Sequence, residues 1–275
     1  MILVDGVVSD EVAALDRGLQ YGDGVFETVA TRDGRCEYWP EHIARLQAGC
    51  ARLGFLAPDG GLLRAEAERA LADSHGAGVL KIIVTRGVGG RGYRPPSRPE
   101  PVRIVAAFPF PDHPPSYAEQ GIRLHACRTP AADHPALAGL KHLNRLPQVL
   151  ARAEWDDPAA PEGLMRDLAG HPVEGTQSNL FLVRDGVLLT PDLSTVGVAG
   201  IIRARVLALA TAGGIEARVE SLPVDALDHA DEVFVCNSLI GIWPVNALEH
   251  RAWPVGPVTR TLQTALDDER RCRSG

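Results

Sequence analysis

Four prolines fall within residues 109–115, and this segment limits how the chain can fold. Proline fixes its own φ and donates no backbone hydrogen bond, so neither a helix nor a central strand continues easily through such a segment. A chain of 275 residues is long enough to build a core on each side of it. We therefore predict a smaller N-terminal α+β domain over residues 1–108, a linker over 109–117 and a larger C-terminal domain over 118–275.

Hydrophobic periodicity predicts short strands and amphipathic helices in both domains. Asp5-Gly6 lies between two short apolar runs, which favours a two-residue hairpin turn. Other strands are expected at 25–31, 78–85, 103–108, 122–127, 162–167, 179–184, 187–190, 216–221 and 232–236. Helices are expected from Pro40 and over 62–72, 144–155 and 200–210. A loop is expected from Asn237 onward, and a frayed tail over 267–275. Strands and helices mix without a regular βαβ alternation, so the expected fold class is α+β.

Composition excludes several classes of function. A net charge of -7 argues against a general nucleic-acid binder. The histidines and cysteines show no metal-ligand spacing, so no metal site is expected. No basic leader is visible, and no apolar run approaches the roughly 20 residues that span a bilayer. The five cysteines are scattered, which suits reduced thiols, so we expect a cytoplasmic protein that binds no membrane.

A lysine within an apolar stretch is the first candidate for chemistry. Lys141 lies between the apolar residues Leu137, Ala138 and Leu140 and a helix-like run that begins at Leu146. An apolar setting removes hydration and disfavours the charged form of a lysine. The uncharged amine is a nucleophile that forms a Schiff base with a carbonyl compound. The alternative is an ordinary solvated lysine, and this stretch alone does not separate the two.

A glycine-rich segment over residues 87–92 follows a predicted strand and allows three interpretations. A phosphate-binding loop would need Gly-Lys-Ser/Thr and a helix, but Tyr93 and Arg94 with two prolines follow instead. The second interpretation is a flexible turn. The third is a loop that clamps substrate carboxylates, since arginine binds planar anions through two hydrogen bonds. Its candidates are Arg86, Arg91 and Arg94.

Two further features complement Lys141. Glu174 stands before a polar turn and an apolar strand, where its carboxylate could face a cationic group; the alternative is a surface hairpin. The helix predicted to begin at Gly200 offers unpaired backbone N–H groups, which favour phosphate. An amine, a carboxylate and a phosphate anchor together meet the needs of pyridoxal phosphate.

The combined pattern resembles the class IV (fold-type IV) pyridoxal-phosphate-dependent aminotransferase family. The signature of that family is matched at Glu174, Thr176, Asn179, Leu180, Phe181, Leu188, Thr190, Val198, Gly200, Ile201 and Arg203. Within the family, the likeness is greatest to the aminodeoxychorismate lyases and runs nearly end to end. It is carried by residues 16–24, 86–93, 137–146, 230–232 and 236–238.

This resemblance implies roles for individual residues. Lys141 would be the Schiff-base lysine, and Glu174 would be the partner of the pyridine nitrogen. The remaining cofactor-binding residues would be Arg45, Asn179, Ile201, Ile202, Asn237 and Ser238. The candidates for substrate binding are Arg91, Tyr93, Arg94, Arg145 and Thr28.

The resemblance also implies the activity. It implies a two-domain homodimer that converts 4-amino-4-deoxychorismate to 4-aminobenzoate and pyruvate in folate biosynthesis. The alternative is a D-amino-acid or branched-chain aminotransferase that uses Lys141 and Glu174 with a different carboxylate pocket. A binding or structural protein on a degenerate scaffold is disfavoured, because Lys141, Glu174 and Arg45 are all present.

Overall fold

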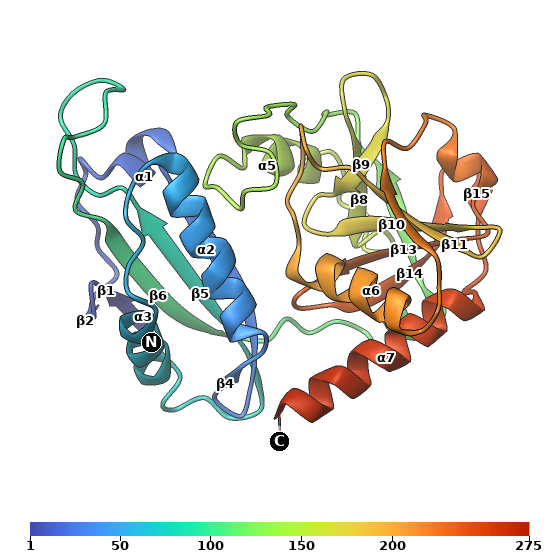
Figure 1. Cartoon of the computed structure of the whole chain (residues 1–275), viewed down its shortest axis with the longest axis horizontal. Helices are drawn as coiled ribbons and strands as arrows, with labels where there is room; N and C mark the ends of the chain where they lie inside the picture. The colour runs from blue at the N-terminus through green and yellow to red at the C-terminus, as the bar shows by residue number, and fades with distance from the viewer. Residues whose placement is uncertain (275) are drawn as a thin grey trace. The chain divides into compact units, whose positions relative to one another are not determined.

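The computed structural model describes residues 1–274 and divides into two compact units (Figure 1). The first unit comprises Met1–Asp112 and Leu140–Asn144. The second unit comprises His113–Gly139 and the residues from Arg145 onward. The chain therefore leaves the first unit inside the proline-rich segment. Helices and mostly antiparallel strands mix in both units, which confirms the predicted α+β class.

The first unit is a six-stranded antiparallel sheet with helices on one face (Figure 1). Its strand order is β2-β1-β6-β5-β3-β4. The strands are β1 (Ile2–Val4), β2 (Val7–Val8), β3 (Gly24–Arg32), β4 (Arg35–Cys36), β5 (Ala77–Thr85) and β6 (Val102–Pro109). The helices are α1 (Arg17–Tyr21), α2 (Trp39–Leu53) and α3 (Gly60–Ala70). The hairpin predicted at Asp5-Gly6 is confirmed, because β1 pairs with β2 across it.

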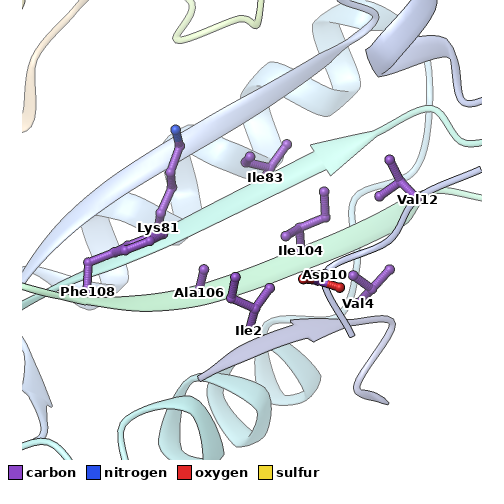
Figure 2. Close-up of a pocket in the computed structure, with 9 residues that line it drawn as sticks. All are labelled: Ile2, Val4, Asp10, Val12, Lys81, Ile83, Ile104, Ala106 and Phe108. Atoms are coloured by element: carbon purple, nitrogen blue, oxygen red, sulfur yellow. The ribbon is translucent and has the colours of Figure 1, made fainter. Parts of the chain in front are cut away.

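Alternation along the strands produces the core of this unit. Alternate residues of β3 and β5, such as Val29 and Leu80, are fully buried against Leu46 of α2 and Leu63 of α3. The opposite face of the sheet holds a pocket (Figure 2). The pocket is lined by Ile2, Val4, Asp10, Val12, Lys81, Ile83, Ile104, Ala106 and Phe108. None of these is a residue that the sequence analysis selected for the site.

Lys141 belongs to the first unit, although the sequence analysis placed it in the C-terminal domain. The backbone of Leu140–Asn144 lies along β3. Phe26 donates its backbone N–H to the carbonyl oxygen of Lys141 at 2.9 Å, and Leu143 donates to Gly24 at 3.0 Å. These backbone bonds tie a segment from the later part of the chain to the early sheet, which local periodicity cannot reveal.

The second unit is built on a nine-stranded sheet. β9 pairs with both β8 and β10, so β10, β13, β14, β7, β8 and β9 form a closed ring. The strands are β7 (Ile122–Ala126), β8 (Glu162–Arg166), β9 (Pro172–Gly175), β10 (Asn179–Arg184), β11 (Val187–Pro191), β12 (Ala217–Glu220), β13 (Glu232–Asn237), β14 (Gly241–Leu248) and β15 (Arg251–Ala252). The helices are α4 (Ser116–Gln120), α5 (Leu146–Arg152), α6 (Ile201–Ala212), the short 3-10 helix η1 (Ala226–His229) and α7 (Pro257–Ser274).

Two predictions for the C-terminal region are wrong. The loop expected from Asn237 onward contains β14, which lies between β13 and β7 in the ring. The frayed tail was expected over 267–275, but residues 267–274 belong to α7, where Arg270 donates to the carbonyl of Ser238 at 3.1 Å; Gly275 lies outside the described residues.

Among residues 1–274, no helix combines the length and the apolar character needed to cross a membrane.

Candidate active site

Lys141 lies on the sheet of the first unit, beside an aromatic ring. Its side chain is partly buried, and its Nζ is 4.5 Å from the centroid of the Phe26 ring. Backbone pairing with β3 fixes the position of the lysine. Phe26 and Thr28 project from the same face of β3, because side chains alternate along a strand. Thr28, a candidate for substrate binding, therefore shares this face.

Arg45 is oriented by a buried carboxylate. Its Nε donates to Oε1 of Glu27 at 2.8 Å and its Nη2 to Oε2 at 2.5 Å. His42 Nδ1 lies 2.6 Å from the same Oε2. Burial alone would raise the pKa of Glu27, but the charge of Arg45 and hydrogen bonds from Arg45 and His42 outweigh it and lower this pKa to about 2. The carboxylate therefore holds the guanidinium of Arg45 in one orientation.

Glu27 and His42 were not selected from the sequence. The available signal is a carboxylate in the middle of β3, between apolar residues and threonines, together with a histidine and an arginine three residues apart on α2. Residues at that spacing lie on one helix face, so His42 and Arg45 are able to reach one partner. A buried charge without a partner would be costly, which makes such a residue in a strand informative.

Glu174 and Asn179 bind the two backbone polar groups of Val198 in the second unit. The backbone N–H of Val198 donates to Oε2 of Glu174 at 2.8 Å, and the carbonyl of Val198 accepts from Nδ2 of Asn179 at 2.8 Å. Both side chains are buried, at 4% and 6% exposure. Glu174 and Asn179 also face each other where β9 pairs with β10. The structure thus joins two of the selected residues to the segment that leads into α6.

The N-terminus of α6 carries Ile201 and Ile202. Gly200 is the N-cap residue, and no side chain caps the helix. A Cβ at position 200 would lie 2.0 Å from Oδ1 of Asn179, so only glycine fits there. The side chains of Ile201 and Ile202 are buried, so any contribution to a ligand comes from their backbone N–H groups. An uncapped helix start of this kind favours a phosphate group.

Asn237 and Ser238 lie at the end of β13. Oδ1 of Asn237 accepts from the backbone N–H groups of Leu239 and Ile240, at 2.8 and 3.0 Å. Its Nδ2 donates to the carbonyl of Gln177 at 3.1 Å. The Asn237 side chain therefore stabilises its own turn and ties it to the turn between Glu174 and Asn179.

The loop after β5 separates its arginines into two groups. Arg91 and Arg94 are exposed, as is Tyr93. Arg86 is buried and donates to Asp23 and to the carbonyl of Leu53. The prediction that Arg86 binds a substrate carboxylate is therefore wrong, because its guanidinium is used within the fold.

Arg17 holds the same loop. It donates to the carbonyls of Gly92 and Tyr93 at 3.2 and 3.0 Å. The sequence analysis did not select Arg17 for this purpose. The anchor keeps the segment between Arg91 and Arg94 in a defined conformation, which a loop that binds a ligand requires.

Arg145 lies at the start of α5 in the second unit. Burial lowers its pKa, and the nearby charge of Glu174 opposes this effect. The signature residues Thr190 and Arg203 serve the fold: Arg203 donates to Oγ1 of Thr190 at 3.1 Å and to the carbonyl of Pro191 at 2.9 Å. These bonds join α6 to β11.

Comparison with known proteins identifies the class to which this arrangement belongs. Residues 24–248 match the family model described as amino-transferase class IV. The chain belongs to this family, which confirms the resemblance found in the sequence.

Individual relatives are similar over nearly the whole chain. An aminodeoxychorismate lyase of Vibrio harveyi is 38% identical over 97% of this chain and 100% of its own. The crystal structure of 4-amino-4-deoxychorismate lyase from Pseudomonas aeruginosa superposes with a TM-score of 0.94 at 50% identity, covering 98% of this chain and 99% of that one. A D-alanine aminotransferase of Bacillus licheniformis is 31% identical over 92% of this chain and 89% of its own.

Proposed function

We propose that the protein is a pyridoxal-phosphate-dependent 4-amino-4-deoxychorismate lyase that forms 4-aminobenzoate and pyruvate for folate biosynthesis. The observation that carries this proposal is the 50% identity and TM-score of 0.94 with the Pseudomonas aeruginosa lyase over 98% of the chain. The aminotransferases among the relatives share the scaffold at lower identity. The lyase is therefore favoured over a transaminase.

The residues present fit pyridoxal phosphate. Lys141 would hold it covalently through its amine, and Glu174 would face the pyridine nitrogen. The backbone of Ile201 and Ile202, the side chain of Arg45 and the turn at Asn237 and Ser238 would hold the phosphate. The fit is supported by the uncapped start of α6 and by the buried carboxylate of Glu174. When bound, the cofactor supplies an electron sink.

The protein's own residues carry out the proton transfers of the reaction. The reaction removes the proton from the amine-bearing ring carbon and breaks the bond between the ring carbon and the enolpyruvyl oxygen. Lys141 is suited to accept that proton at its Nζ and to return one to the departing enolpyruvate, which becomes pyruvate. The ring becomes aromatic, and this supplies much of the driving force.

The substrate carries two carboxylates, which need cationic partners. Arg91 and Arg94 are exposed on the loop held by Arg17, and Tyr93 lies between them. Arg145 is a further candidate in the second unit, and Thr28 is a weaker one beside Phe26. We assign the carboxylates to these residues because arginine pairs with carboxylates through two parallel hydrogen bonds.

The assembly and location are part of the same proposal. We propose a cytoplasmic homodimer of two domains, the smaller over residues 1–108 and the larger over 118–275 apart from Leu140–Asn144, which belong to the first unit. Its particle mass in sedimentation should be twice the chain mass of 29.4 kDa. A single-chain mass at micromolar concentration would contradict the dimer.

The role of Lys141 is tested by spectroscopy. Purified protein supplied with pyridoxal phosphate should show a visible absorption band that is lost in Lys141→Ala. Lys81→Ala is the matched control, because Lys81 Nζ also lies over the Phe26 ring, at 5.6 Å, and its loss should leave the band. A colourless wild-type protein would refute the cofactor assignment.

The products separate lyase from transaminase. Release of pyruvate and 4-aminobenzoate from aminodeoxychorismate without a keto acid is the expected result. Transfer of an amino group from D-alanine to 2-oxoglutarate, with no 4-aminobenzoate formed, would instead establish an aminotransferase.

A further inference from the structure

A second buried carboxylate lies next to the candidate cofactor residues of the second unit. Glu162, at the start of β8, is fully buried. Its Oε1 accepts from the backbone of Gly163 at 2.8 Å and from the backbone and hydroxyl of Thr176 at 3.0 and 2.5 Å. Its Oε2 accepts from the backbone of Gln177 at 3.3 Å and from the hydroxyl of Ser178 at 2.7 Å. Four of these five bonds come from one turn.

That turn connects Glu174 to Asn179. It is closed by a backbone hydrogen bond of 2.7 Å from Gly175 to Ser178. The carbonyl of Gln177, in the same turn, accepts a hydrogen bond from Nδ2 of Asn237. Glu174 and Asn179 in turn hold the N–H and the carbonyl of Val198, directly before α6. A displacement of the turn would therefore move several of the proposed cofactor-binding groups at once.

We propose that Glu162 is a positioning residue for cofactor binding, which acts by fixing the turn between Glu174 and Asn179. This inference rests on the proposed use of pyridoxal phosphate. Glu162 sets the position of the Glu174 carboxylate and of the backbone at Val198. It thereby also sets the position of the start of α6.

The chemistry of the turn requires a carboxylate at position 162. All five partners of Glu162 donate, so an acceptor-only group satisfies them. A glutamine of the same size would place an NH₂ group against backbone N–H donors, and leaving such buried donors unpaired is costly. Packing is equally tight: a Cβ at Gly175 would lie 2.2 Å from Oγ of Ser178 and 2.9 Å from Cδ of Glu162. The turn therefore has little room to rearrange around a different partner.

The same unit offers a matched control. Glu232 is also buried and accepts from the backbone of Val258 and from the backbone and hydroxyl of Thr259, at 3.0, 2.7 and 2.6 Å. It lies at the opposite end of β13 from Asn237. Glu232→Gln should thus disturb the start of α7 while leaving the turn at 175–178 in place.

The experiment compares Glu162→Gln with Glu232→Gln in the full-length chain. Absorbance titration of the apoprotein with pyridoxal phosphate should show a Kd raised at least tenfold in Glu162→Gln and within twofold of wild type in Glu232→Gln. Loss of a group that orients a metal ligand typically weakens metal binding about 10- to 100-fold, and we expect an effect of the same scale here. Amide hydrogen exchange of the apoproteins should be at least tenfold faster at Val198 in Glu162→Gln and unchanged there in Glu232→Gln. Glu232→Gln should instead speed exchange at Val258 and Thr259.

The outcomes separate the inference from the proposed function. Unchanged exchange at Val198 together with an unchanged Kd in Glu162→Gln would overturn the inference, as would equal losses in both variants. If Glu162→Gln does not fold, Ser178→Ala removes one donor to the carboxylate, and its Kd and exchange decide in the same way. A wild-type protein that takes up no pyridoxal phosphate refutes the proposed function, and the exchange at Val198 still decides whether Glu162 holds this segment.

Discussion

Glu27, buried with Arg45 and His42, both stabilises the fold and orients Arg45, a candidate site residue. The carboxylate is 1% exposed, so its charge depends on its two partners. Its pKa falls from the ordinary value of 4.5 to about 2 on folding. A depressed pKa of this kind stabilises the fold above about pH 4.5, and the stabilisation is lost as the pH falls toward 2.

We predict that Glu27→Gln is less stable than wild type at pH 7, by up to about 3 kcal/mol, from roughly 1.4 kcal/mol per pKa unit. The difference in the free energy of unfolding should shrink as the pH falls below 4.5, because the carboxylate of the unfolded chain takes up a proton there while that of the folded chain stays charged until the pH approaches 2. Denaturant unfolding at pH 7, 5, 4 and 3 measures it. Glu68→Gln is the control: Glu68 forms an exposed ion pair with Arg64, so this substitution should cost little stability at any pH. A difference independent of pH would contradict the prediction.

At the scale of elements, the start of α6 depends on a close approach that only glycine allows. Gly200→Ala would place a Cβ 2.0 Å from Oδ1 of Asn179. Asn179 cannot turn away without losing its bond to Val198. We therefore expect Gly200→Ala to destabilise the fold by about 1–3 kcal/mol, as overpacking does, and to weaken the binding of pyridoxal phosphate.

Thermal unfolding and absorbance titration measure both effects of Gly200→Ala. Gly213→Ala at the other end of α6 is the control, because Gly213 has an ordinary φ of -83° and its Cβ would lie 3.3 and 3.7 Å from the carbonyl oxygens of Leu209 and Ala210. Equal losses of stability and of cofactor binding in the two variants would show that the close approach of Asn179 to Gly200 does not limit the residue at position 200.

Elements with strong local signals were predicted from the sequence, and those defined by tertiary pairing were not. The hairpin at Asp5-Gly6 and the helix α2 follow from turn chemistry and periodicity. β14 was missed because it is defined by its pairing with β13 and β7 in the ring, which local periodicity does not show. At the site, Lys141 and Glu174 lie in recognisable motifs. Glu162 does not, because the sequence cannot show that five donors converge on its carboxylate.

At the scale of the whole molecule, the reactivity of the five cysteine thiols tests whether both units are folded. None forms a disulfide among the described residues. Burial raises the pKa of the Cys36 thiol to about 11 in the first unit and that of Cys50 to about 12. Burial likewise raises the pKa of Cys127 and of Cys236 to about 12 in the second unit. Cys272, on α7, is exposed. Since the thiolate is the reactive form, the four desolvated thiols should be inert while both units stay folded.

We predict that an aromatic disulfide reagent at pH 8 modifies one thiol per native chain rapidly, and all five in guanidinium. Cys272→Ser should abolish the rapid phase and leave the slow one, because the remaining thiols react only when a unit opens. Rapid modification of two or more thiols in the native wild type would contradict the burial of Cys50, Cys127 and Cys236 and the half-buried position of Cys36. If bound pyridoxal phosphate stabilises the second unit, it should slow the modification of Cys127 and Cys236, since a ligand that binds only the folded state lowers the open population. Peptide mapping of the labelled cysteines at successive times would assign this protection to individual thiols, and equal slow rates with and without the cofactor would argue against that stabilisation.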